Sequence, residues 1–317
     1  MHVTPRLAVA AGLLGIALTG CQVPARDQHL VQALPDFLRG TPPAATPAAA
    51  SGPADAQLRP RPSPTPAPAA PPTPVAEVPP QLSGPDAVAA QLAGAEQAIQ
   101  AAPASPQALR EAARAQQSAL DAVACHPDWR DAVNSRVPTQ VQPAVQAETT
   151  AAVDLRQLNR ASDELPHWQV TAPPRAEDRL AWYHEAEQAS GIPWSYLAAI
   201  NLVETRMGRI HADSSAGAQG PMQFMPDTWQ QYGNGGDVHD PHAAILAAGR
   251  FLQVAGGPQD MAAALHEYNP SDLYVEAVTA YAQRIQGDPK AFLAYYDWQA
   301  DAAITSGDVI LPAGFSH

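Results

Sequence analysis

The sequence predicts a mainly α-helical protein, and three observations support this fold class. Apolar residues recur at helical spacing through most of the chain after residue 84. Residues that favour helix ends, such as Pro, Gly, Ser and Asp, stand where these helices should begin and stop. Before that point the chain is rich in Pro and Ala, a composition that cannot bury a core. We therefore expect a helical protein preceded by an extended segment.

The first 20 residues are typical of a lipoprotein signal peptide. Arg6 supplies positive charge, residues 7–18 form a short apolar run, and residues 18–21, LTGC, resemble a lipobox. We expect Cys21 to become the lipidated N-terminus; the alternative is a secretory signal cleaved near Gly20. Because the apolar run is too short to span a bilayer, the protein should touch the membrane only through its lipid. This predicts an extracytoplasmic, lipid-anchored location in the cell envelope.

Residues 21–83 form the expected disordered tether, with PRPSPTPAPAAPPTP near the centre of its Pro/Ala-rich part. Such a composition favours an extended, polyproline-like chain. At about 3.1 Å per residue, the stretch from 41 to 83 would reach roughly 130 Å. An anchored protein could then act at some distance from its membrane. A low-complexity spacer without any length requirement explains the same composition.

Residues 84–164 predict a helical module with three apolar stripes. The stripes are Val88, Leu92, Ala95 and Ile99; Leu109, Ala113, Leu120 and Val123; and Val145, Ala152, Leu155 and Leu158. A Pro-containing break at 103–106 separates the first two helices. Because the stripes are thin and alanine-rich, we expect the module to dock on the following domain or to carry a partner. Its role and any protein partners stay open.

The charge and the cysteine count exclude several classes of function. A net charge of −13 argues against nucleic acid or an anionic membrane surface as the partner, since both would repel the chain. A neutral glycan remains compatible with this charge. After lipidation of Cys21 only Cys125 remains, so no internal disulfide can form. Cys125 has no companion cysteines for a metal site, and we predict a buried thiol.

Residues 165–317 should form a second helical unit, which begins with a connector over 165–174. Each of its outer helices starts or ends at a residue suited to that position. The expected helices are Arg175–Ser190, a DTWQQY helix after Pro226 closed by Gly233, a helix from Pro241 with Asp240 as its cap, and a helix capped by Ser271. The tail from 303 to 315 should form two short strands or an ordered cover.

The segment that starts at Pro193 predicts a helix that is apolar nearly all round and therefore buried. Its main stripe consists of Tyr196, Ile200, Val203 and Met207, and Gly208 should end it. Glu204 lies near this end. Because burial penalises the ionised form, the pKa of Glu204 should rise, and the carboxyl could then hold a proton near neutral pH as a general acid must. On the helix alone, the alternative is an ion pair of Glu204 with Arg206 or Arg209.

The loop after this helix predicts a groove of mixed polarity. Gly217 and Gly220 permit close approach of the backbone, Ser214 and Gln223 can form hydrogen bonds, and Met225 offers apolar surface. A buried acid beside such a loop has the outline of a site for a sugar polymer.

Four motifs follow one another through this half of the chain: VETRMGR, then GAQGPMQFMPDTWQQY, DPHAAI from Asp240, and EYN at 267–269. Together they resemble the lytic transglycosylases of the lysozyme superfamily, over roughly the last third to half of the chain. The helix motif and QFMP are closest to the membrane-bound B branch, whereas SSAGAQGPMQ is similar to the soluble branch. The resemblance implies a lysozyme-like, goose-type catalytic domain over residues 165–317.

The resemblance also implies the substrate and the reaction. In that family, which acts on peptidoglycan glycan strands, one glutamate protonates the leaving oxygen of the MurNAc-β-1,4-GlcNAc bond. It then takes a proton from the C6 hydroxyl of MurNAc, which attacks C1 and leaves a 1,6-anhydro end without consuming water. By motif position Glu204 takes this role. The implied substrate contacts are Ser214, Gln223, Met225, Tyr268 and Asn269. Ser215 competes with Ser214, because the spacing from the glutamate is one residue longer than in the soluble branch.

The sequence departs from the family pattern at the groove and at a calcium loop. Pro221 replaces the commoner leucine and Pro270 follows the Tyr-Asn pair, so the edge of the groove should differ. The B branch has an acidic calcium loop, but the corresponding GNGGDVHD offers only Asp237 and Asp240 as carboxylates. Calcium takes roughly six to eight oxygen ligands. We therefore expect no calcium, no other metal and no cofactor, with Asp240 acting as a helix cap.

Two other functions fit the same residues. A muramidase would use water and a second carboxylate, for which Asp213, Asp227 and Asp237 are candidates, and it would leave reducing ends. A catalytically inactive wall-binding lipoprotein would keep the groove without turnover, and Glu204→Gln would then leave its binding unchanged. The presence of the acid, the loop and the Tyr-Asn pair together favours the transglycosylase.

Overall fold

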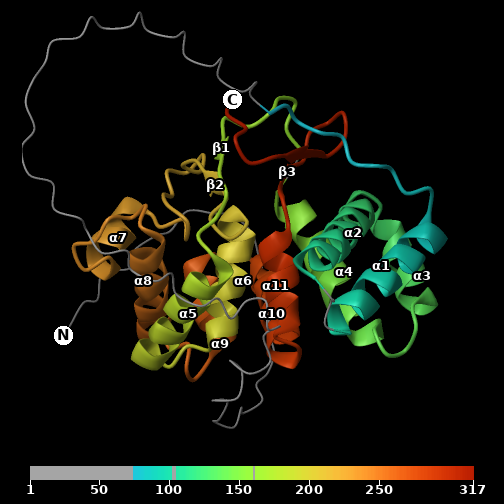
Figure 1. Ribbon diagram of the computed structural model, residues 1–317. Helices are drawn as coiled ribbons and strands as arrows, with labels where there is room; N and C mark the ends of the chain where they lie inside the picture. Colours follow the sequence, from blue (N-terminus) through green and yellow to red (C-terminus); the bar gives the residue numbers. More distant parts are fainter. Residues whose placement is uncertain (1–73, 102–104, 160) are drawn as a thin grey trace, which may run out of the picture.

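The computed structural model describes residues 74–101, 105–159 and 161–317, and this part of the chain is mainly helical, as predicted. The predicted signal peptide, Cys21 and residues 21–73 of the predicted tether lie outside the described residues. The helices form an N-terminal and a C-terminal group, and short strands lie at one end of both groups (Figure 1).

The N-terminal group consists of α1 (Pro85–Gln100), α2 (Pro106–Cys125), a short 3-10 turn (Pro127–Trp129), α3 (Arg130–Arg136) and α4 (Gln142–Leu158). Every residue of the first two predicted stripes is buried. In the third stripe only Val145 is fully buried, and α4 instead turns the polar residues Glu148 and Thr149 inward. The prediction of an apolar buried face was wrong for most of α4, because this helix faces a buried polar network. The sequence also gave no signal for α3, which buries only Val133.

The C-terminal group consists of α5 (Ala176–Ser190), α6 (Trp194–Thr205), α7 (Pro226–Tyr232), α8 (Pro241–Val254), α9 (Met261–Tyr268), α10 (Asp272–Gly287) and α11 (Lys290–Asp297). At its centre α6 packs against α5, α8, α10 and α11, and most of its residues are buried. The predicted cap of α8 is confirmed, since an Asp240 carboxylate oxygen accepts from Ala243 N at 2.8 Å. Ser271 precedes α10 as expected, although its side chain makes no capping hydrogen bond. Neither α9 nor α11 was predicted as a helix from the sequence.

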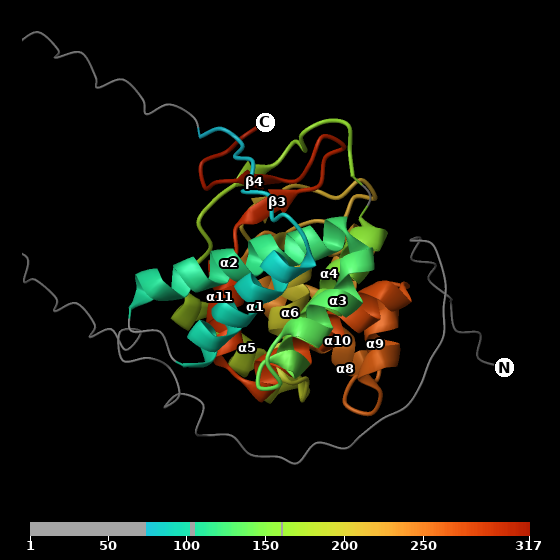
Figure 2. The same cartoon turned by 90° about the vertical axis from the view of Figure 1, so that its right-hand side faces the viewer.

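Two antiparallel pairs of strands cover one end of the helices (Figures 1 and 2). β1 (Gln169–Val170) pairs with β2 (Ile210–His211), and β3 (Ala300–Ala302) pairs with β4 (Val309–Leu311). Of the two strands expected within residues 303–315, only β4 lies there, because its partner β3 ends at Ala302. Glu77 exchanges two backbone hydrogen bonds with Ile310, of 2.8 and 2.7 Å. The described end of the Pro-rich segment is thus held against β4.

The two helix groups share one hydrophobic core, which contains buried residues of α1, α2, α4, α6 and α10. α4 packs along α10, and α2 packs on α4 and α11. Figure 1 shows α10 and α11 between the remaining C-terminal helices and the N-terminal group, and Figure 2 shows the N-terminal helices across the front of this layer. The helical module therefore lies directly against the domain that carries Glu204.

A buried polar network joins the two groups inside this core. Glu96 on α1 accepts from Gln116 Nε2 at 2.5 Å and from Arg284 Nη2 of α10 at 2.7 Å. Glu148 on α4 accepts from Tyr295 Oη of α11 at 2.5 Å and from Gln116 Nε2 at 3.1 Å. Burial, followed by the nearby charge of Glu96, holds the pKa of Glu148 well above its usual range. Arg284 Nε lies 3.6 Å from Glu148 Oε1. The guanidinium of Arg284 therefore contacts two carboxyl groups, those of Glu96 and Glu148, which are both fully buried.

Cys125 is exposed, so the prediction of a buried thiol is wrong. As the last residue of α2 it lies beyond the apolar stripe that ends at Val123. Its Sγ donates to Asp308 Oδ2 at 3.1 Å. Desolvation of the sulfur and this carboxylate raise the pKa of the thiol to about 12, so the reactive thiolate is suppressed.

Candidate active site

Glu204 is the penultimate residue of α6, and a left-handed turn closes the helix directly after it. The φ angles of Arg206, Met207 and Gly208 are 51°, 58° and 72°. The helix therefore ends at Thr205, before the glycine that was expected to end it. Residues with a Cβ atom adopt this region rarely, and two in a row store backbone strain next to the carboxyl.

Tyr274 on the first turns of α10 holds the carboxyl of Glu204. Its hydroxyl donates to Glu204 Oε1 at 2.7 Å, and the tyrosine is 1% exposed. Sequence reasoning missed this residue. The available signal was its place on the buried face of α10, with Ala277, Val278 and Tyr281 at helical spacing. That spacing predicts a core tyrosine and does not reveal which polar group it meets.

The surroundings of Glu204 favour its protonated form. The side chain is partly buried, so one portion remains open to solvent or to a ligand. Burial raises the pKa of Glu204 to about 7, and the hydrogen bond from Tyr274 opposes this rise as a smaller effect. Among the described residues, no charged side chain contributes to this shift. The carboxyl can therefore give up and take back a proton near neutral pH.

The two arginines near Glu204 are engaged elsewhere, which excludes the alternative of a structural ion pair. Arg206 makes two hydrogen bonds to Asp301, at 2.7 and 3.1 Å. Arg209 Nη2 donates to the backbone oxygen of Tyr296 at 2.6 Å.

The loop after α6 is fastened to the helix beside Glu204. The backbone oxygen of Pro221 accepts from Asn201 Nδ2 at 2.8 Å and from Thr205 Oγ1 at 2.6 Å. Gly220 has a φ of 72°, and a Cβ there would come within 2.0 Å of the Val238 oxygen, so this position requires glycine. The loop is therefore positioned by the same helix that carries the acid.

Three of the predicted substrate contacts lie on this loop. Ser214 is exposed, and its Oγ accepts from Ala218 N at 3.0 Å, which shapes the loop and leaves its own hydroxyl proton free to donate. Ser215 is also exposed. Gln223 Nε2 donates to the Gly220 oxygen at 2.9 Å, and Met225 precedes α7 as a partly buried residue.

Tyr268 and Asn269 lie at the end of α9, close to the acid. The Tyr268 hydroxyl donates to the Met222 oxygen at 2.6 Å, so it fastens the loop and does not bond Glu204. Its ring is parallel to that of Tyr274, with 6.5 Å between the ring centroids. Burial, followed by the nearby Glu204, raises the pKa of Tyr268 well above its usual range. Asn269 is partly buried, and its Oδ1 atom is buried without a protein partner. The structure thus places Tyr268 near Glu204, while a different tyrosine, Tyr274, makes the direct contact.

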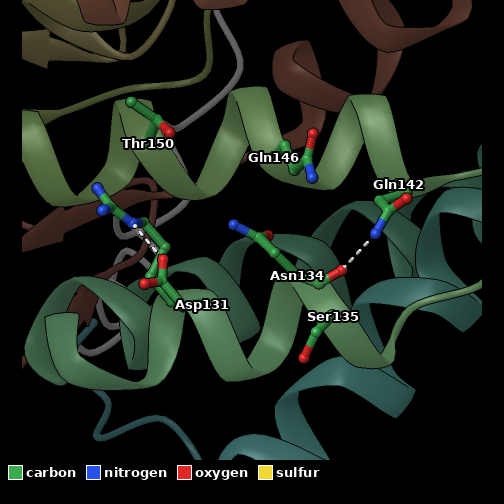
Figure 3. Close-up of a pocket in the computed structure, with 7 residues that line it drawn as sticks. Asp131, Asn134, Ser135, Gln142, Gln146 and Thr150 are labelled. Atoms are coloured by element: carbon green, nitrogen blue, oxygen red, sulfur yellow. Dashed lines mark hydrogen bonds and ion pairs between the residues drawn. The ribbon is translucent and has the colours of Figure 1, made fainter.

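Glu204 does not line either of two cavities that open on the described part of the chain. One of about 600 Å³ lies behind the loop and is lined by residues that include Pro174, Gly208, His211, Asp213 and Pro221. The other, of about 530 Å³, lies between α3 and α4 and is lined by polar side chains such as Asn134, Gln142 and Gln146 (Figure 3).

The candidate second carboxylates are placed without a link to Glu204. Asp213 accepts from Gln219 Nε2 at 3.3 Å, Asp227 lies in the first turn of α7, and Asp237 accepts from His239 N at 2.9 Å. Asp240 caps α8. Within the described ranges, no group of three or more His, Cys, Asp or Glu side chains has an arrangement that could hold a metal ion.

The fold and the site define a mainly helical domain with one protonatable carboxyl at the end of a buried helix. Residues 182–286 match the family of transglycosylase SLT domains. This segment runs from α5 to α10 and includes Glu204, the loop and Tyr274. The resemblance to the lytic transglycosylases of the lysozyme superfamily is therefore confirmed over this segment of the chain.

A curated relative supports the same assignment. The chain is 30% identical over 128 residues to the membrane-bound lytic murein transglycosylase F of Thiobacillus denitrificans, an alignment that covers 38% of this chain and 27% of the relative. The chain thus spans about a quarter of that relative's length. No solved structure matches the chain. In the part that the structure describes, no helix is both long and apolar enough to cross a membrane.

Proposed function

We propose that the protein is a peptidoglycan lytic transglycosylase in which Glu204 is the general acid and then the base. The observation that carries the proposal is the position of Glu204 inside the matched SLT segment, partly buried, with a pKa of about 7. A single group that performs both proton transfers needs a pKa close to the working pH, because it must be a competent donor in one step and a competent acceptor in the next.

The reaction requires two proton transfers at one carboxyl. Protonated Glu204 donates to the glycosidic oxygen while the bond between MurNAc C1 and that oxygen breaks, which releases GlcNAc O4 as a hydroxyl. The resulting carboxylate takes the proton of the MurNAc C6 hydroxyl, whose oxygen forms the new bond to C1. The carboxyl ends the cycle protonated, and no water enters the product. One carboxyl is enough, as in the substrate-assisted glycosidases.

The loop and the end of α9 are the proposed binding surface for the glycan strand. Ser214, Gln223, Met225, Tyr268 and Asn269 are the residues we assign to it. The unpartnered Oδ1 of Asn269 and the free hydroxyl proton of Ser214 support the assignment, since both can bind sugar hydroxyl or acetamido groups.

The rest of the chain fits an enzyme of the cell envelope. We assign residues 1–20 to a lipoprotein signal peptide, Cys21 to lipidation, and residues 21–73 to a tether between the lipid and the folded part, since Glu77 in the expected tether of 21–83 is paired with β4. Residues 84–164 form the helical module and residues 165–317 the catalytic domain. The proposed partners are the glycan strands and, through the lipid only, a membrane.

Mass spectrometry of digested peptidoglycan tests the proposal. Purified sacculi treated with the protein should release muropeptides that end in 1,6-anhydroMurNAc. Reducing MurNAc ends would show a muramidase instead. Binding to sacculi without any release of muropeptides would show an inactive wall-binding protein.

The rate should depend on pH through Glu204. The acid must be protonated to donate, so kcat/KM is expected to fall by about tenfold per pH unit above its pKa, which burial raises to about 7. An ordinary glutamate would place this decline near pH 4.5. Initial rates of muropeptide release between pH 5 and 9 measure this dependence. The assignment would be contradicted if kcat/KM had already fallen to its lowest value below about pH 6.

Tyr274→Phe should shift this profile and slow the reaction. The Tyr274 hydroxyl stabilises the ionised form of Glu204, so its loss should raise the pKa of the carboxyl and move the decline to higher pH. Loss of orientation should lower kcat by about tenfold. Tyr268→Phe is the matched control, because its hydroxyl bonds the Met222 oxygen and should leave the position of the decline unchanged.

A further inference from the structure

We propose that the N-terminal helical module positions the acid-bearing end of α6 through a relay of three side chains, Gln117, Asp301 and Arg206. The inference rests on the proposed function and gives the module a role in it. Gln117 belongs to α2, Asp301 to β3, and Arg206 to the left-handed turn that follows Glu204 by two residues.

The first link joins the module to the start of β3. Gln117 is 2% exposed. Its Nε2 donates to the Gln299 oxygen at 3.0 Å and to Asp301 Oδ1 at 3.1 Å, and its Oε1 accepts from Gln299 N at 2.9 Å. A buried amide that uses both ends on one short segment fixes the position of that segment. Gln117 therefore sets where the Asp301 carboxylate lies.

The second link joins β3 to the turn after Glu204. Arg206 Nε and Nη2 donate to the two oxygens of Asp301, at 2.7 and 3.1 Å, in a bidentate pair. The guanidinium also lies over the Trp298 ring, 5.7 Å from its centroid, and Trp298 Nε1 donates to Gln116 Oε1 at 3.0 Å. The module thus reaches Arg206 through Gln117 and Asp301 and, in parallel, through Gln116 and Trp298.

Other charges near the relay do not compete for Arg206. Burial, followed by the nearby charge of Asp301, holds the pKa of Asp121 well above its usual range, and Asp121 makes no hydrogen bond to Arg206. Asp308 is paired with Arg156 at 2.5 Å. Asp301 is therefore the carboxyl group that holds Arg206, through the two hydrogen bonds to its side chain.

The geometry explains why this link matters for Glu204. Arg206 and Met207 hold left-handed φ angles that cost free energy, and such strain persists only when surrounding contacts enforce it. Their backbone N–H groups close the last turn of α6, with bonds to the oxygens of Leu202 and Asn201. If the Arg206 side chain is released, the turn can relax, and the last turn of α6 with Glu204 loses its fixed position. A shift of about 1 Å in a catalytic group can cost about 100-fold in rate.

The test compares three variants of the full chain: Gln117→Leu, Arg206→Met and the double variant. We expect Gln117→Leu to lower kcat by about tenfold and Arg206→Met to lower it by about 50-fold. The KM for soluble glycan strands should change by less than about twofold in both variants. The small effect on KM is expected because neither residue belongs to the proposed binding surface. Since the two act in one path, the double variant should be no slower than Arg206→Met alone.

Gln91→Leu is the matched control. Gln91 Nε2 donates to the Ala115 oxygen at 2.9 Å, which joins α1 to α2 within the module, and Gln91 bonds neither Asp301 nor Arg206. This variant should keep the wild-type kcat. An equal loss of kcat in Gln91→Leu and Gln117→Leu would overturn the relay, because general loosening of the module would then explain both. Wild-type kcat in Gln117→Leu, or additive losses in the double variant, would also overturn it.

The same experiment separates failure of the relay from failure of the proposed function. If the wild-type protein releases no anhydro muropeptides, the proposed function fails. If the wild type cleaves glycan, Glu204→Gln does not, and Gln117→Leu matches the wild type, only the relay fails.

Discussion

Glu204→Gln is expected to lower the rate of muropeptide release by at least about 1000-fold. Proton transfer by a positioned acid contributes roughly 100- to 10,000-fold, and here one carboxyl serves both steps. Gln keeps the size of the side chain and can still accept from Tyr274, but it cannot donate and recover a proton. The measurement is the initial rate of release of soluble muropeptides from purified sacculi at pH 6.

A matched glutamate and a stability measurement complete this experiment. Glu267→Gln changes an exposed carboxyl on α9 beside the Tyr-Asn pair and should keep the wild-type rate.

The pKa of Glu204 is raised from 4.5 to about 7 on folding, so the folded state binds the proton more tightly and the free energy of unfolding falls as the pH rises through this range. Glu204→Gln removes this cost and should melt at or above the wild-type temperature at pH 8. Normal activity in Glu204→Gln would refute its role.

Arg284→Met should lower the free energy of unfolding by about 3–5 kcal/mol, the cost of leaving buried charge without its partner. Arg284 is 8% exposed and lies between Glu96 and Glu148, which are both fully buried. Met fills part of the same volume without a charge. Equilibrium unfolding in urea measures the loss, which is large against the 5–15 kcal/mol total of a typical domain.

Arg136→Met is the matched control for this stability effect. Arg136 pairs with Asp86 at 2.5 Å, but the two side chains are 44% and 85% exposed. An exposed pair contributes less than about 1 kcal/mol, so this variant should unfold near the wild-type urea concentration. Comparable losses in both variants would contradict the claim that the Glu96–Arg284–Glu148 network holds the two helix groups together.

The elements that the sequence predicted well are those with local signals. Pro226 and Gly233 bound α7, and Asp240 with Pro241 starts α8, because caps and prolines act on their own helix. The first two stripes of the N-terminal module are buried as predicted, since their partners are apolar. Glu204 stood out because it is a lone carboxyl on a helix that is apolar nearly all round.

The parts that were missed depend on contacts between distant segments. Tyr274 lies 70 residues from Glu204 in the chain, and its stripe looks the same whether its hydroxyl meets an acid or a backbone oxygen. The inward face of α4 is polar because Arg284 lies opposite it, which no periodicity on α4 can reveal. Cys125 was placed inside because free cysteines are usually buried, whereas its position at a helix end exposes it.

The central claim is that Glu204 returns its proton by activating the C6 hydroxyl of MurNAc and not a water molecule. Digestion of sacculi in water enriched in ¹⁸O tests this directly, because hydrolysis places an oxygen atom of water on C1 and the intramolecular attack does not. The account predicts muropeptides that carry anhydro ends and no ¹⁸O at C1 at the earliest time points. Incorporation of ¹⁸O at C1 of the newly formed ends would contradict it.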